Sequence, residues 1–258
     1  MNSLPYASHW ELHTLLAWFD REPTLRIALI TGAGTKAFCA GQDLIEQGRI
    51  ADAAARVRAG QAQQGEGVLP PQMLTHPPSG FAAISRRQGK KPIVAAVNGF
   101  ALGGGFETVL GCDMVVAAPT ATFGLPEASR GLYAAAGGLA RLVRVVGLPV
   151  ATEIAMAGRV LKADEAKALG VVNVVSQTRE SVVEEAVKLA ARIAELSPDA
   201  VIVTRAGLRM ALEVGSVEVA AQKTEEIYGT RMREAENIRI GLEAFAKKQK
   251  PQWVPSKL

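Results

Sequence analysis

Aromatic residues are scarce in this sequence, where they make up 5% of 258 residues. Such a low content argues against an aromatic-girdled β-barrel and is common in tightly packed α/β proteins. Hydrophobic residues account for 48% of the chain, which is enough for a buried core and excludes global disorder. The length fits one large domain, or one domain with a small appendage.

Cysteines are few, and long hydrophobic runs are missing. With Cys39 and Cys112 as its two cysteines, the chain cannot build a disulfide framework, so we expect a reducing compartment. The longest apolar runs, residues 93–97 and 114–119, are far too short to cross a bilayer. The first residues lack the basic region and apolar core of a signal peptide. We therefore expect no membrane span.

A strong charge imbalance is absent as well. The formal net charge is +4, and the Lys and Arg residues are scattered along the chain. We therefore expect no nucleic-acid partner, although a binding site for an anionic group is compatible with this charge.

The sequence ends in Ser256, Lys257 and Leu258. At an extreme C-terminus this tripeptide is a peroxisomal address read by an import receptor, the alternative being an accidental ending. The residues before it, 247–255, are basic and contain prolines, which predicts an exposed tail. We therefore predict a peroxisomal protein.

Short apolar segments alternate with helical ones up to about residue 175, and nearly everything from residue 180 onward has a helical pattern. This order predicts an α/β core followed by helices. Residues 50–80 look irregular, with one helical piece near 52–58. The expected strands are residues 26–31, 92–97, 113–118 and 171–175, with a short strand or turn at 122–125; the expected helices include 9–20, 81–87, 105–110, 139–145, 151–157 and 163–168.

The three histidines do not predict a metal site. His9 and His13 lie four residues apart, but the glutamate between them is misplaced for a zinc protease. We interpret both as residues of a helix surface, and His76 as part of a proline-rich loop.

Three segments carry candidate chemistry: residues 38–44, 98–107 and 123–127. Three glycines before a helix let backbone N–H groups approach an anion or oxyanion, although close strand–helix packing would also need them. Glu107 in the first helical turn either complements the helix dipole or acts as a functional carboxylate. Glu127 is likewise either a surface acid or a second catalytic carboxylate.

Taken together, these segments resemble the crotonase superfamily, also called the enoyl-CoA hydratase/isomerase family. The similar stretches are TLRIALITGAGTKAFCAGQDL, KKPIVAAVNGFALGGGFETVLGCDMVVAA, ATFGLPEASRGLYAAAGGLARL and GLEAFAKKQKPQW. The resemblance implies an α/β fold: a crotonase-type ββα spiral core over residues 1–190. A helical region that mediates trimerisation would follow over residues 191–258.

The resemblance also implies roles for individual residues. The backbone N–H groups of Ala40 and Gly104 would form an oxyanion hole for a thioester carbonyl. Glu107 would activate water, and Glu127 would supply the proton to C2. The implied substrate-binding residues are Ala40, Gly41, Gln42, Asp43, Gly103 and, from the tail of a neighbouring subunit, Phe245 and Lys248.

The implied function is hydration of the C2=C3 double bond of a 2-enoyl-CoA, with a fatty or specialised acyl group. Coenzyme A is then part of the substrate, and neither a metal nor another cofactor is implied. A homotrimer or homohexamer is expected. The alternatives are an enoyl-CoA isomerase, another CoA-thioester lyase or dehydratase, a non-catalytic RNA-binding or scaffold member, and an inactive fragment.

Three departures from the family pattern affect these expectations. A strand pair that usually precedes the segment at Met1 is missing, and residues 50–78 form a longer loop than usual. Residues 131–136 replace a turn that contains Pro-Gly in many hydratases. Tyr133 in this segment either shapes the acyl pocket or serves ordinary packing.

Overall fold

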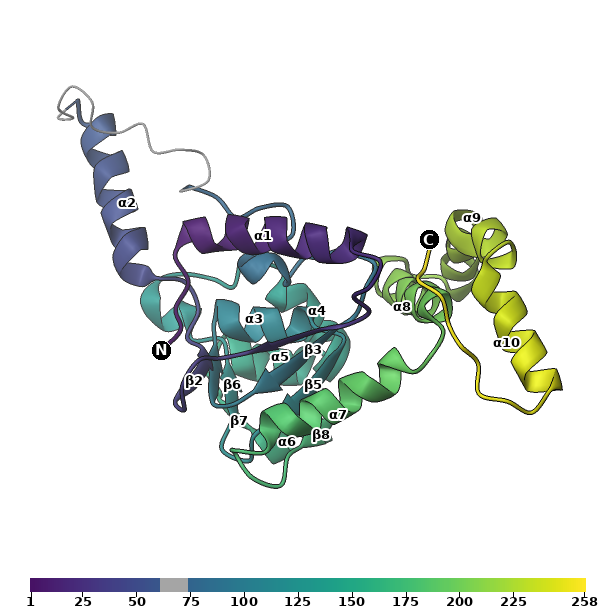
Figure 1. Ribbon diagram of the computed structural model, residues 1–258. Coiled ribbons are helices and arrows are strands. Elements are labelled where there is room, and N and C mark those ends of the chain that lie inside the picture. The colour runs from purple at the N-terminus through teal and green to yellow at the C-terminus, as the bar shows by residue number, and fades with distance from the viewer. Residues whose placement is uncertain (61–73) are drawn as a thin grey trace.

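The computed structural model describes residues 1–60 and 74–258. Two four-stranded sheets form the centre of this part of the chain, with strand orders β1-β3-β5-β8 and β2-β4-β6-β7 (Figure 1). The first sheet is entirely parallel, and β7 is antiparallel to β6 in the second. The strands are β1 (Ala28–Thr31), β2 (Ala37–Cys39), β3 (Ile93–Val97), β4 (Phe100–Leu102), β5 (Met114–Ala117), β6 (Thr122–Gly124), β7 (Leu161–Lys162) and β8 (Val174–Val175).

The chain winds as a spiral in which each turn adds one strand to each sheet. Strands β1 and β2 belong to the first turn, β3 and β4 to the second, and β5 and β6 to the third. Neighbouring turns are in parallel register, so Val94 of β3 pairs with Leu29 on one side and Met114 on the other. The predicted crotonase-type spiral is confirmed.

Ten helices surround and extend this core in the described residues. They are α1 (Tyr6–Arg21), α2 (Leu44–Arg58), α3 (Gly104–Gly111), α4 (Gly138–Val146), α5 (Leu148–Ala155), α6 (Ala163–Ala168), α7 (Val182–Ala194), α8 (Pro198–Glu213), α9 (Val217–Arg233) and α10 (Glu236–Ala246). Helix α7 packs against the first sheet, while α8, α9 and α10 lie to one side of the core (Figure 1). No described helix is long and apolar enough to cross a membrane.

Strand β3 is the centre of the hydrophobic core. Each of its five residues is at most 2% exposed, because other strands flank it and helices cover it. A strand buried on both faces needs a continuous apolar run rather than an alternating pattern. This is why the sequence IVAAV predicts the strand so directly.

Two predicted elements differ from the structure. The helix expected at 81–87 is only a 3₁₀ turn, Phe81–Ala83, because Ala82 and Ala83 adopt left-handed φ angles of +50° and +54°. The helical piece expected near 52–58 begins already at Leu44, where the Asp43 carboxylate accepts hydrogen bonds from two free backbone N–H groups. Of the predicted long loop, residues 61–73 lie outside the described residues.

A buried ion cluster attaches the C-terminal helices to the core. Asp113, at the start of β5, accepts from Arg205 Nε at 2.9 Å and Arg209 Nη2 at 2.8 Å, both on α8. Its second carboxylate oxygen accepts from the backbone N–H of Ile93 at 2.9 Å. One side chain thus joins two strands of the first sheet to α8.

Candidate functional site

Two glycine turns meet at the carboxyl ends of β2 and β4. Gly41 and Gly103 have φ angles of +93° and +55°, a region that favours glycine. A Cβ atom on Gly41 would lie 3.3 Å from the backbone N of Gly104, and one on Gly103 would lie 3.0 Å from Glu127 Oε1. The two turns and Glu127 therefore lie against one another, and the place where they meet is called the groove below.

The backbone N–H groups beside this groove differ in whether they already donate a hydrogen bond within the chain. Gly104 opens α3, and no acceptor for its N–H is found among the described residues. The Ala40 N–H donates to the Met1 carbonyl oxygen at 3.0 Å, so it is not the free donor that the predicted oxyanion role requires. The N–H of Gln42, two residues on, has no acceptor in the described part of the chain. No sequence motif indicates the hydrogen bond from Ala40 to Met1 that distinguishes these two N–H groups.

Glu107 is a buried carboxylate that is held by a hydrogen bond from the start of α4. Its side chain is on the first turn of α3 and is 3% exposed. Oε1 accepts a hydrogen bond of 2.8 Å from the N–H of Gly138, at the start of α4. Burial raises the pKa of Glu107 to about 7; the Gly138 N–H opposes this shift, and the charge of Glu127 adds to it. Glu107 is therefore suited to gain and lose a proton near neutral pH.

Glu127 is the second carboxylate at the groove. It begins the 3₁₀ turn η3 (Glu127–Arg130), and burial raises its pKa above the usual value. Its Oε2 atom is buried and has no hydrogen-bond partner among the described residues. A cavity of about 340 Å³ adjoins it, lined by Tyr133 and by the apolar side chains of Leu132, Leu139 and Met156. Tyr133 thus lies where an acyl group could reach it, although 73% of it is exposed.

The side chains of His9, His76 and Gln42 form a polar cluster next to the Phe81 ring. The interpretation of His9 as a surface residue is wrong, because His9 is 0% exposed and its ring lies 4.5 Å from that of Phe81. Its Nε2 atom is 2.9 Å from Gln42 Oε1, and His76 Nε2 is 3.1 Å from the same oxygen. His13, one helical turn further on, contacts the Ser79 hydroxyl instead. The four-residue spacing of the histidines therefore does not bring them to one site.

The remaining predicted site residues lie apart from the groove or serve the fold. Asp43 caps α2 through its side chain. Phe245, near the end of α10, is 86% exposed, and Lys248 follows the same helix. Within one chain, α10 lies on the far side of the molecule from the groove (Figure 1). A role for Phe245 or Lys248 in binding would therefore need a second subunit.

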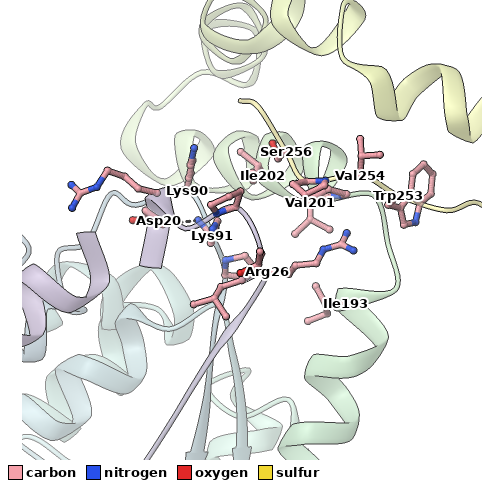
Figure 2. A pocket seen from close by; sticks show the side chains of 17 residues that line it. Asp20, Arg26, Lys90, Lys91, Ile193, Val201, Ile202, Trp253, Val254 and Ser256 are labelled. Atoms are coloured by element: carbon pink, nitrogen blue, oxygen red, sulfur yellow. Dashed lines mark hydrogen bonds between the residues drawn. The ribbon is translucent and has the colours of Figure 1, made fainter. Parts of the chain in front are cut away.

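Residues 247–250 are exposed, as the composition of the C-terminal segment predicts, whereas several residues after them are held against the rest of the chain. The Asn237 side chain bonds both the N–H and the carbonyl of Val254, and Trp253 Nε1 donates to the Glu195 carbonyl at 2.9 Å. Leu258 is 7% exposed. Figure 2 shows the segment running past a cavity of about 240 Å³, opposite Arg26 and Lys91. Backbone hydrogen bonds and burial, which composition does not reveal, hold it in place.

Comparisons with known proteins agree on one family. Residues 1–256 match the family model described as enoyl-CoA hydratase/isomerase. The chain is 46% identical to a mevalonyl-coenzyme A hydratase of Beauveria bassiana, with 100% of this chain and 88% of that protein covered. It is 34% identical to a carnitinyl-CoA dehydratase of Proteus mirabilis, with 98% and 90% covered. An enoyl-CoA hydratase structure from Bacillus anthracis matches with a TM-score of 0.80 at 30% identity, with 98% and 91% covered.

Proposed function

Because the chain belongs to the enoyl-CoA hydratase/isomerase family, we propose that it adds water to, or removes water from, the C2–C3 bond of an acyl-CoA thioester. One observation carries this proposal. The buried Glu107 and the half-buried Glu127 lie close enough to interact through their charges, and Glu127 borders the groove with the unengaged N–H groups of Gln42 and Gly104. This arrangement provides an oxyanion site together with an acid and a base.

The two N–H groups supply the electrostatic part of the reaction. Hydrogen bonds from Gln42 and Gly104 to the thioester oxygen stabilise the enolate that forms while C2 or C3 reacts. The Gly104 donor also benefits from the positive end of α3. Loss of one such donor typically lowers kcat by about 10²- to 10³-fold.

The two carboxylates supply the proton transfers. In hydration, Glu107 takes a proton from the water that attacks C3, and Glu127 gives its proton to C2. In dehydration, Glu127 removes the C2 proton, and Glu107 protonates the C3 hydroxyl as it leaves as water. Each direction starts and ends with one proton on the pair, which requires that one carboxyl is neutral and the other ionised. The raised pKa values of Glu107 and Glu127 suit this state.

The names of the relatives suggest the acyl group. Both the mevalonyl-CoA hydratase and the carnitinyl-CoA dehydratase are named for water chemistry on a CoA thioester. A mevalonyl group carries hydroxyls on C3 and C5 and a methyl on C3. We therefore propose mevalonyl-CoA and its 2-enoyl dehydration product as the substrate pair. The presence of two carboxylates favours this chemistry over double-bond isomerisation.

The test follows absorbance of the conjugated enoyl thioester after mixing the protein with mevalonyl-CoA. Glu107→Gln and Glu127→Gln should each lower kcat by about 10²- to 10⁴-fold, because each removes a proton carrier. Glu184→Gln, on an exposed face of α7, is the matched control and should keep full activity. Full activity of both site variants would exclude the two-carboxylate mechanism. Migration of the double bond without water exchange would support the isomerase instead.

We also propose that the protein is a homotrimer or homohexamer in peroxisomes. Large exposed side chains on the C-terminal helices, Leu208, Leu242 and Phe245, support self-association. The Ser256-Lys257-Leu258 tripeptide supports the location, provided that Leu258 leaves its buried position to meet a receptor. Light scattering and fluorescence microscopy of a tagged full-length protein test the two statements separately.

A further inference from the structure

The hydrogen bonds around Gln42 fix the orientation of its side-chain amide. The backbone N–H of Ala82 donates to His9 Nδ1 at 3.1 Å, so the proton of this imidazole is on Nε2. His9 Nε2–H therefore donates to its partner on Gln42, 2.9 Å away, and this partner must be the carbonyl oxygen. His76 Nε2 lies 3.1 Å from the same oxygen and donates to it as well. The NH₂ group of Gln42 is consequently on the other side of the amide.

This NH₂ group is a buried donor without an acceptor. Four buried side-chain N or O atoms lack a hydrogen-bond partner among the described residues, and two of them are Gln42 Nε2 and Glu127 Oε2. Unsatisfied buried polar groups are rare in proteins because each has lost its hydrogen bonds to water without gaining others. Gln42 Nε2 is therefore free to donate to a bound molecule, and Glu127 Oε2 is free to accept from one.

The two imidazoles that contact Gln42 are polar but uncharged. Burial lowers the pKa of His9, and it lowers that of His76 to about 4, so both imidazoles are neutral at pH 7. Their rings pack against Tyr6 and Phe81, at centroid distances of 4.5 to 6.1 Å. Such a site matches a neutral oxygen, such as a hydroxyl, better than a carboxylate or phosphate.

We propose that Gln42 is a specificity-determining residue whose Nε2–H binds a hydroxyl oxygen of the acyl chain beyond C3. This rests on the proposed function, in which the Gln42 backbone N–H binds the thioester oxygen. The glutamine side chain and the acyl chain then both start near this hydrogen bond. The number of bonds from Gln42 Cα to Nε2 equals the number from C1 to C5 of the acyl chain, so Nε2 and the carbon that bears a C5 hydroxyl are equally far along their chains. His9 and His76 are positioning residues that hold the amide in this orientation.

The experiment compares the binding of two unreactive esters, 5-hydroxy-3-methylpentanoyl-CoA and 3-methylpentanoyl-CoA. Neither has a C2=C3 double bond or a C3 hydroxyl, so neither gains nor loses water. By calorimetry, the full-length protein should bind the hydroxylated ester roughly 10-fold more tightly, as expected for one buried hydrogen bond. Gln42→Met should bind both esters equally, whereas Gln252→Met, at an exposed position, should keep the preference. Equal binding of both esters by the unaltered protein, or an unchanged preference in Gln42→Met, would overturn the proposal.

A second variant covers the possibility that Gln42→Met disturbs the fold. Gln42→Glu keeps an oxygen acceptor for both imidazoles but replaces the NH₂ donor by another acceptor. The 5-methoxy ester accepts a hydrogen bond without donating one, so the unaltered protein should prefer it over the plain ester and Gln42→Glu should not. A retained preference in Gln42→Glu contradicts the assignment. Absence of water exchange with mevalonyl-CoA would refute the proposed function alone, since the binding ratio does not depend on turnover.

Discussion

The core and the C-terminal helices use their apolar side chains differently. Every residue of β3 is at most 2% exposed, whereas α9, with 17 residues, buries Ala220 and Gly229 and leaves Val217 87% exposed. The core is therefore complete within one chain, while the C-terminal helices keep apolar surface available for contact with another chain. The proposed catalytic site and the proposed self-association surface thus lie in separate regions, and the following substitutions compare these regions.

The largest loss of stability is expected at the junction of these regions. Asp113→Ala removes the partner of Arg205 and Arg209 and leaves both guanidiniums largely buried, which should lower the free energy of unfolding by about 3–5 kcal/mol. Urea denaturation measures this loss of unfolding free energy, and Asp52→Ala, on an exposed face of α2, is the control. If α8–α10 were tied to the core mainly by other contacts, the loss would be well below this range.

A pair of leucines compares the two regions directly. Leu142 on α4 is 0% exposed and Leu208 on α8 is 69% exposed. Leu142→Ala should cost about 2–5 kcal/mol of unfolding free energy because it leaves a cavity. Leu208→Ala should change this value by less than about 0.5 kcal/mol in the monomer. Equal effects in thermal melts of the monomer would mean that α8 packs as tightly as the core.

Glycines should also behave differently in the two regions. At Gly41, with φ of +93°, a Cβ would lie 3.1 Å from the Leu102 carbonyl oxygen, so Gly41→Ala should cost about 1–3 kcal/mol and reduce turnover. In α8, a Cβ on Gly207 would lie 3.5 Å from Thr224, an ordinary contact. Gly207→Ala should therefore stabilise the protein by up to about 1 kcal/mol. Denaturation curves of the two variants should shift in opposite directions.

The last prediction concerns the pH dependence contributed by Glu107. Its pKa is about 7 in the folded protein and near 4.5 in the unfolded chain, so between these values the folded state holds a proton that the unfolded state has lost. Stability should therefore fall as pH rises from about 4.5 to about 7, by up to roughly 1.4 kcal/mol per pH unit. Glu107→Gln should flatten this slope, and parallel pH profiles for both proteins would contradict the raised pKa.

The sequence predicted the core better than its surroundings. The IVAAV run and the triple glycine fixed β3 and the start of α3, because continuous apolar residues and glycines leave few local alternatives. The prediction of a helix at 81–87 is wrong because tertiary contacts impose left-handed φ angles on Ala82 and Ala83. One of these contacts is the hydrogen bond from the Ala82 N–H to His9. The buried position of His9 and the pairing of Ala40 with Met1 likewise depend on residues distant in sequence. Motif spacing therefore could not identify which backbone N–H groups are free donors.

The Gly41–Gln42 turn has a consequence for how new activities could arise on this scaffold. A backbone N–H is present in every residue except proline, so in the proposed site an exchange of residue 42 preserves one donor to the thioester while it changes the side chain that contacts the acyl group. Single substitutions can then change the selectivity for the acyl group while each variant remains active. A library restricted to positions 9, 42 and 76 would explore new acyl groups while leaving both carboxylates intact.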